Sequence, residues 1–124
     1  MLTYSPFYAG FAVDDSDAAK RFYAETLGVD VIDLGGGLFS LRAQNGYAVL
    51  VYPKPDHEPA GHTILNFPVE DIETTVDGLA ERGVKFEHYD QGPIKTNEKG
   101  IAQPGPKQAW FRDPAGNILS VVEG

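Results

Sequence analysis

Three histidines and a few hydroxyl groups are the side chains best suited to chemistry, because the chain contains no cysteine. Without cysteine there is no redox thiol, thiolate nucleophile or thiolate metal site. Tyr8 and His62 are the groups that we consider as a general acid or base, for an isomerisation or lyase reaction. No Ser-His-Asp order, phosphate-binding loop or glycine-rich dinucleotide turn accompanies them, and the three glycines at 35–37 are typical of a hairpin. These residues leave an enzyme without a metal as one open hypothesis.

Length and charge narrow the class of protein. A chain of 124 residues is long enough for one domain with a modest core. The formal charge of −8 repels the phosphates of nucleic acids and of anionic lipids. No window approaches the roughly 18 apolar residues of a membrane span, and the first ten residues carry no basic patch or apolar core of a leader. We therefore expect a cytoplasmic protein with neither nucleic acid nor a membrane as partner.

Apolar periodicity predicts a β-α-β-β-β order in the first half. An alternating strand is followed by acidic residues that cap a helix, and three short apolar runs separated by glycine turns then form an antiparallel meander. The predicted ranges are a strand at 4–13, a helix at 18–27, and strands at 29–34, 38–42 and 47–52.

The second half repeats the first. Residues 11–15, Phe-Ala-Val-Asp-Asp, match residues 67–71, Phe-Pro-Val-Glu-Asp, and Gly28-Val29 matches Gly83-Val84. The predicted elements are a helix at 72–82 and strands at 85–90, 108–112 and 118–123, with a tight turn at 113–117. The chain is thus one domain, 1–124, with a first module at about 5–53, a connector at 53–61 and a second module at about 62–124.

The segment 91–107 allows two interpretations. It is long for a connection in a compact domain, and its polar residues favour a lid over a site. Its glycine and proline content equally favours a disordered surface insertion.

These features together carry a family resemblance. The duplicated module, the helix with Phe22-Tyr23 before Leu27-Gly28, and the closing run Phe-Arg-Asp-Pro-Ala-Gly-Asn at 111–117 resemble the vicinal oxygen chelate superfamily. That group includes glyoxalase I, bleomycin-resistance proteins, fosfomycin-resistance enzymes and extradiol dioxygenases. The resemblance implies an α+β fold in which two tandem βαβββ modules form a cupped, partly closed, eight-stranded sheet around a small-molecule cavity. It also implies a homodimer.

The resemblance further implies where a metal would bind. Metal-dependent members place His or Glu in the first and last strand of each module, and the matching positions here are Tyr8, Leu50, Ile64 and Ser120. Leucine and isoleucine cannot bind a cation, and one phenol with one hydroxyl is too little for a divalent ion. We therefore expect no metal and no other cofactor. A displaced site at His62, two residues before Ile64, remains the alternative.

Strand alternation predicts the lining of the cavity. Aromatic and aliphatic side chains form a wall with a few polar points, which is typical of a site for a planar organic ligand. The predicted ligand-binding residues are Tyr8, Ser40, Leu50, Tyr52, His62, Ile64, Asn66, Gln108, Trp110, Arg112 and Ser120. Trp110 either stacks on the ligand or fills the core or a dimer interface.

Three hypotheses for function follow. The first is a metal-free protein that binds an aromatic or amphipathic organic compound, for example to sequester an antibiotic or toxin, with a cationic drug favoured by the acidic charge. The second is a glyoxalase-like lyase, isomerase or dioxygenase that uses a metal near His62 or acid-base chemistry by Tyr8 and His62. The third is an interaction domain whose cavity is filled by its own side chains.

Overall fold

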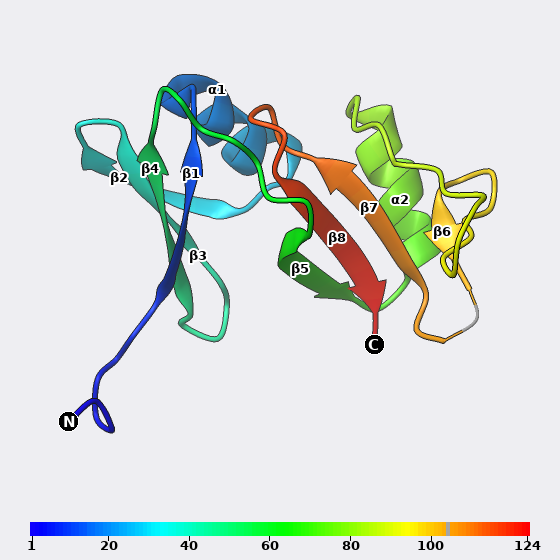
Figure 1. Ribbon diagram of the computed structural model, residues 1–124, viewed down its shortest axis with the longest axis horizontal. Helices are drawn as coiled ribbons and strands as arrows, with labels where there is room; N and C mark the ends of the chain where they lie inside the picture. Colours follow the sequence, from blue (N-terminus) through cyan, green and yellow to red (C-terminus); the bar gives the residue numbers. More distant parts are fainter. Residues whose placement is uncertain (104) are drawn as a thin grey trace. The chain divides into compact units, whose positions relative to one another are not determined.

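The computed structural model describes residues 1–103 and 105–124. The chain divides into two compact units, Met1–His57 and Glu58–Gly124, and each unit holds one four-stranded sheet and its own helix (Figure 1). The elements are β1 (Ala9–Val13), α1 (Ser16–Arg21), η1 (Phe22–Thr26), β2 (Asp30–Gly35), β3 (Leu38–Arg42), β4 (Ala48–Pro53), β5 (Thr63–Val69), α2 (Ile72–Glu81), β6 (Ile101–Ala102), β7 (Gln108–Arg112) and β8 (Ile118–Glu123). Within the described ranges, no helix has both the length and the apolar character needed to cross a membrane.

The sheet of the first unit has the strand order β1-β4-β3-β2. The predicted meander is confirmed, because β2 pairs antiparallel with β3 and β3 antiparallel with β4, while β1 runs parallel to β4. Tyr23 is fully buried, and its ring centroid lies 6.0 Å from that of Phe11 and 6.4 Å from that of Phe39. This aromatic cluster joins the helical segment to β1 and β3. Burial of its large rings stabilises the core of the unit.

The first helical segment differs from the predicted single helix at 18–27. Asp15 caps α1 by accepting a hydrogen bond from the backbone N–H of Ala18 at 3.1 Å. After α1 the bonds lengthen to five residues, as in that from Leu27 N–H to Phe22 O at 3.0 Å, so η1 is a π-helical turn. Gly28, with φ of +71°, then ends the segment.

The first strand is also shorter than predicted. β1 begins at Ala9 rather than at residue 4, because its neighbour β4 begins at Ala48 and its paired residues run from Val49 to Pro53. The ladder with β4 begins only at Ala9, so the alternating side chains of residues 4–8 do not belong to a strand.

The sheet of the second unit has the order β5-β8-β7-β6, again with a parallel pair, β5 and β8, next to an antiparallel one, β7 and β8. α2 packs against β8 (Figure 1). Two carboxylates accept hydrogen bonds from the N-terminus of α2. Asp71 accepts from the N–H of Thr74 at 3.2 Å, and Glu123 accepts from the N–H of Ile72 at 3.1 Å. The Thr74 bond lowers the pKa of Asp71 below its ordinary value.

The predicted strand at 85–90 is wrong. Only Phe86 forms a bridge there, to Phe111, and the fourth strand is instead the two-residue β6 within the long segment. The backbone N–H of Glu87 donates to Trp110 O of β7 at 2.8 Å. The backbone N–H of Tyr89 donates to Thr96 Oγ1, also at 2.8 Å. Such single bonds hold an irregular chain in place without a ladder.

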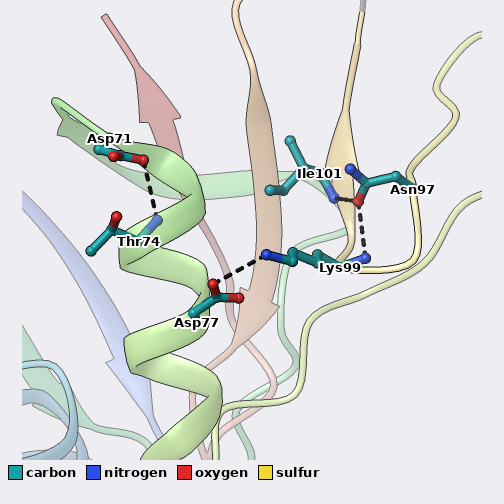
Figure 2. A network of polar contacts seen from close by, with 6 residues as sticks. All are labelled: Asp71, Thr74, Asp77, Asn97, Lys99 and Ile101. Atoms are coloured by element: carbon teal, nitrogen blue, oxygen red, sulfur yellow. Dashed lines mark hydrogen bonds and ion pairs between the residues drawn. The ribbon is translucent and has the colours of Figure 1, made fainter.

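The segment 91–107, apart from residue 104 outside the described residues, makes specific contacts. Asn97 Oδ1 accepts from the N–H of Lys99 at 2.9 Å and of Ile101 at 3.0 Å, and Lys99 Nζ reaches Asp77 of α2 at 3.1 Å (Figure 2). Asp77 raises the pKa of Lys99. Gly100 is buried with φ of +89°, and a side chain there would lie 2.9 Å from the Cβ of Phe86. The segment is thereby attached to α2 and to residues 86–88.

The predicted turn at 113–117 is confirmed and is tightly bonded. Asp113 is 4% exposed, and its Oδ1 accepts from the N–H groups of Ala115 and Asn117, each at 2.9 Å. Its Oδ2 accepts from Asn117 Nδ2 at 3.0 Å. Gly116 has φ of +87°, which glycine adopts without strain.

Candidate ligand-binding site

Asn66, Ser120 and Trp110 form one row across three neighbouring strands. Asn66 of β5 pairs with Ser120 of β8, and Ser120 pairs with Trp110 of β7. Because directly paired residues point to the same side of a sheet, these side chains share one face. We call this surface, with Gln108 and Thr63, the Ser120 face.

The hydroxyl of Ser120 lies at the centre of a hydrogen-bonded chain. Ser120 is fully buried, and it donates to Asn66 Oδ1 at 2.5 Å while it accepts from Gln108 Nε2 at 3.1 Å. The three predicted residues are thus brought together by direct contact. All three side chains are uncharged, so this hydrogen-bonded row can orient a ligand through hydrogen bonds but offers it no charged group.

A bulge in β5 changes the predicted alternation. Thr63 pairs with Ile118 and Leu65 with Leu119, so Ile64 is an extra residue at a register shift. Thr63 consequently lies on the Ser120 face, where its Oγ1 accepts from Trp110 Nε1 at 3.1 Å. Strict alternation from Ile64 missed Thr63, and no local signal in the sequence marks the bulge.

Trp110 is only 9% exposed. Its N–H is bonded to Thr63, and the ring of Tyr89 meets it edge-on with centroids 5.7 Å apart. Tyr89 was not among the predicted site residues, because residues 85–90 were predicted to form a strand, whereas the chain at Tyr89 is irregular. The ring of Trp110 is therefore held in a fixed orientation by the protein itself, which leaves Asn66 and Gln108 as the more accessible polar groups of this face.

His62 and Arg112 lie at the margin of this arrangement. His62 is exposed and precedes the first residue of β5. Arg112 donates to Glu87 Oε1 at 2.5 Å and to the backbone oxygen of Gly116 at 3.2 Å, so its guanidinium braces the turn after β7.

The other four predicted residues belong to the first unit. Ser40 pairs with Leu50, and Leu50 pairs with Gly10, so Ser40 and Leu50 share a face of their sheet. Tyr52 pairs with Ala12 two residues further along the strands and lies on the same face. Tyr8 precedes β1 and is 64% exposed. That these four line one cavity with the residues of the second unit stays a prediction.

The donor set does not fit a metal ion. Of the positions that the resemblance assigns to ligands, Leu50 and Ile64 have no donor atom, and the Ser120 hydroxyl is engaged by two amides. Around His62 and elsewhere in residues 1–103 and 105–124, no three His, Cys, Asp or Glu side chains are grouped so that they could hold a metal.

Comparison with known proteins places the fold in a wider group. Residues 6–121 match the model of the Glyoxalase/Bleomycin resistance protein/Dioxygenase superfamily. The chain is 26% identical to the uncharacterized protein YraH of Bacillus subtilis (strain 168), over 90% of this chain and 91% of that protein.

Two solved structures resemble it over nearly their whole length. TnmS3, an antibiotic binding protein from Streptomyces sp. CB03234, has a TM-score of 0.69 and 22% identity, with 98% of each chain covered. Lactoylglutathione lyase from Agrobacterium tumefaciens has a TM-score of 0.64 and 26% identity, with 97% of this chain and 94% of that chain covered.

Proposed function

We propose that this chain, which belongs to the Glyoxalase/Bleomycin resistance protein/Dioxygenase superfamily, binds a small organic compound and uses no metal ion to do so. The observation that carries this proposal is the state of Ser120. It occupies a position where metal-dependent members are expected to place a ligand, and its hydroxyl is instead buried between the amides of Asn66 and Gln108. A hydroxyl that is already bonded twice is a poor donor to a divalent ion.

The ligand that we propose is an aromatic or amphipathic molecule. Trp110 and Tyr89 supply rings beside the polar groups of the Ser120 face. Apolar walls with a few directed polar groups are typical of small-molecule sites. Sequestration of an antibiotic or toxin is one form of this function, and its support is the likeness in fold to TnmS3, an antibiotic binding protein.

Ligand binding can be followed by the fluorescence of Trp110, which is the single tryptophan of the chain. Titration with a panel of aromatic drugs and metabolites should give saturable quenching for at least one compound. The same compound should then be measured by calorimetry on Trp110→Phe, which keeps a ring but removes the indole. If no compound binds, the third hypothesis, a domain without an open site, replaces this proposal.

Metal analysis tests the other half of the proposal. Purified, untagged protein should retain no stoichiometric divalent ion after dialysis. One tightly bound ion per chain that is lost in His62→Ala, and kept in His57→Ala as the matched control, would instead establish the displaced site and reopen metal-dependent catalysis.

We also propose that the protein is a homodimer in the cytoplasm. Nine of its large apolar side chains with high exposure lie in the first unit, among them Tyr8, Ile32 and Tyr52, whereas Ile94 is the one found among the described residues of the second. Exposed apolar groups gathered in one unit favour a partner surface there. Light scattering should give twice the chain mass, and Ile32→Lys should shift it toward the monomer, whereas Ile94→Lys should not.

A further inference from the structure

We infer that the Ser120 face selects a neutral ligand carrying an amide or lactam group, with its carbonyl oxygen toward Asn66 and its N–H toward Gln108. This inference rests on the proposed function, because it names the chemistry of the compound that the same site would bind. It comes from the direction of the hydrogen bonds through Ser120.

The two distances define that direction. The contact between Ser120 Oγ and Asn66 Oδ1 measures 2.5 Å, which lies in the range of O–H···O bonds and below that of N–H···O bonds. The contact between Gln108 Nε2 and Ser120 Oγ measures 3.1 Å, which suits an N–H donor. Ser120 therefore donates its O–H hydrogen bond to Asn66 and accepts a hydrogen bond from the NH2 group of Gln108.

This order leaves two complementary groups for a ligand. Asn66 uses its oxygen toward Ser120, so its NH2 group is the donor that remains, and Gln108 uses its NH2 group, so its carbonyl oxygen is the acceptor that remains. Asn66 is exposed and Gln108 is half-buried, so both can be reached. An amide or lactam offers the reverse pair, an acceptor oxygen beside an N–H donor.

The charges around this face disfavour an ionic ligand. None of the five residues that define this face carries a formal charge. The nearest cation along β7 is Arg112, two residues from Trp110, and it is paired with Glu87 at 2.5 Å. A carboxylate or ammonium group bound at Ser120 would lose water without gaining an opposite charge, which is costly. The acidic charge of the whole chain would attract cations to its surface, but it supplies no partner at this position.

Three probes with one ring system test the inference: 2-naphthamide, 2-naphthoate and 2-naphthylmethylammonium. We expect 2-naphthamide to bind at least about tenfold more tightly than either ion, a difference of about 1.4 kcal/mol. The titrations are run at about 0.5 M NaCl, where long-range attraction to the acidic surface is screened. Side-chain NH2 resonances of Asn66 and Gln108 in NMR spectra should shift with the amide probe.

A matched pair of variants assigns the effect to the hydrogen bonds. Asn66→Asp keeps the side-chain shape and its oxygen toward Ser120 but replaces the donor by an acceptor, so 2-naphthamide should bind at least about tenfold more weakly. Asn45→Asp makes the same change in an exposed turn of the first unit and should leave binding unchanged. Both variants add one negative charge, so a general electrostatic effect would appear in both.

The outcomes separate this inference from the proposed function. If an ionic probe binds as tightly as 2-naphthamide, or if Asn66→Asp binds the amide as well as the parent protein does, the amide preference is wrong while ligand binding stands. If none of the probes binds and the wider panel of aromatic compounds also fails, the proposed function and this inference both fall.

Discussion

The two units share a backbone plan but differ in the side chains that it presents. In the first sheet the central row reads Gly10, Leu50 and Ser40, and in the second sheet the corresponding row reads Asn66, Ser120 and Trp110. Both rows join a parallel strand pair to an antiparallel one. The first row therefore presents an aliphatic centre, whereas the second presents a bonded hydroxyl between an amide and an indole.

The turns after β3 and β7 show the same contrast. In the first unit Ala43 N–H bonds Tyr47 O at 2.8 Å and Gly46 N–H bonds Ala43 O at 3.1 Å. In the second, Asp113 N–H bonds Asn117 O at 3.0 Å and Gly116 N–H bonds Asp113 O at 3.0 Å. Only the second turn adds a buried carboxylate.

A common ladder of backbone hydrogen bonds can therefore hold either kind of face. The repeated pattern of strands and turns determines the register, and single side-chain changes within that register determine whether a face is apolar or polar. The following experiments test how strongly each unit depends on its own side chains.

Gly100→Ala should have the largest effect. The left-handed backbone at this position costs about 1–2 kcal/mol for alanine, and the contact of 2.9 Å with the Cβ of Phe86 adds about 1–3 kcal/mol of overpacking. The matched control is Gly46→Ala in the first unit, which has φ of +90° but open space around it. Urea unfolding should show a clearly larger loss for Gly100→Ala, and equal losses would contradict the close packing of the loop against Phe86.

Asp113→Ala should destabilise the protein by about 2–3 kcal/mol, because it leaves buried N–H groups of the turn without their acceptor. Asn45→Ala removes the side-chain bond of the first turn, to Tyr47 N–H at 3.0 Å, but this turn is exposed to water. Its cost should stay within about 0.5 kcal/mol. Thermal unfolding of both variants measures the difference, and a small effect of Asp113→Ala would show that the two turns are energetically alike.

The double variant Ala43→Asp, Tyr47→Asn should give the first turn the side-chain hydrogen bonds that Asp113 and Asn117 form in the second. Because the backbone bonds already agree, the new carboxylate can accept from the N–H of residue 45 and replace Asn45 as the acceptor for the N–H of residue 47. We therefore expect a gain of up to about 1 kcal/mol in the free energy of unfolding. Chemical unfolding would detect it. A loss would mean that burial, and not the residue pair alone, makes the second turn stable.

Acid should weaken the capped start of α2. The pKa of Asp71 is lowered by the bond from Thr74 N–H, so its ionised form stabilises the folded state above the ordinary pKa of 3.8, and this contribution is lost as the pH falls below that value. Asp71→Asn keeps a capping side chain without the charge. The variant should be less stable than the parent protein at pH 7, and the two free energies of unfolding should converge near pH 3. A difference that stays constant with pH would contradict the role of the Asp71 charge.

Local sequence patterns predict the tandem β-α-β-β-β order, the turn at 113–117, and the strands at 38–42, 108–112 and 118–123 with their boundaries. These features follow from local physics, since strand alternation, capping residues and glycine turns act over a few neighbouring residues. The sequence also named Asn66, Gln108 and Ser120, because alternation holds along β7 and β8 and along the part of β5 that follows its bulge.

The remaining features arise only when distant segments of the chain meet in the fold. The bulge that brings Thr63 to Trp110, the edge contact of Tyr89, the π-helical turn after α1 and the replacement of the strand at 85–90 by β6 all depend on partners distant in the sequence. Ser120 shows both levels at once. Its place on the sheet could be counted along the chain, but the two amides that bond its hydroxyl come from other strands, so only the folded sheet defines what that hydroxyl does.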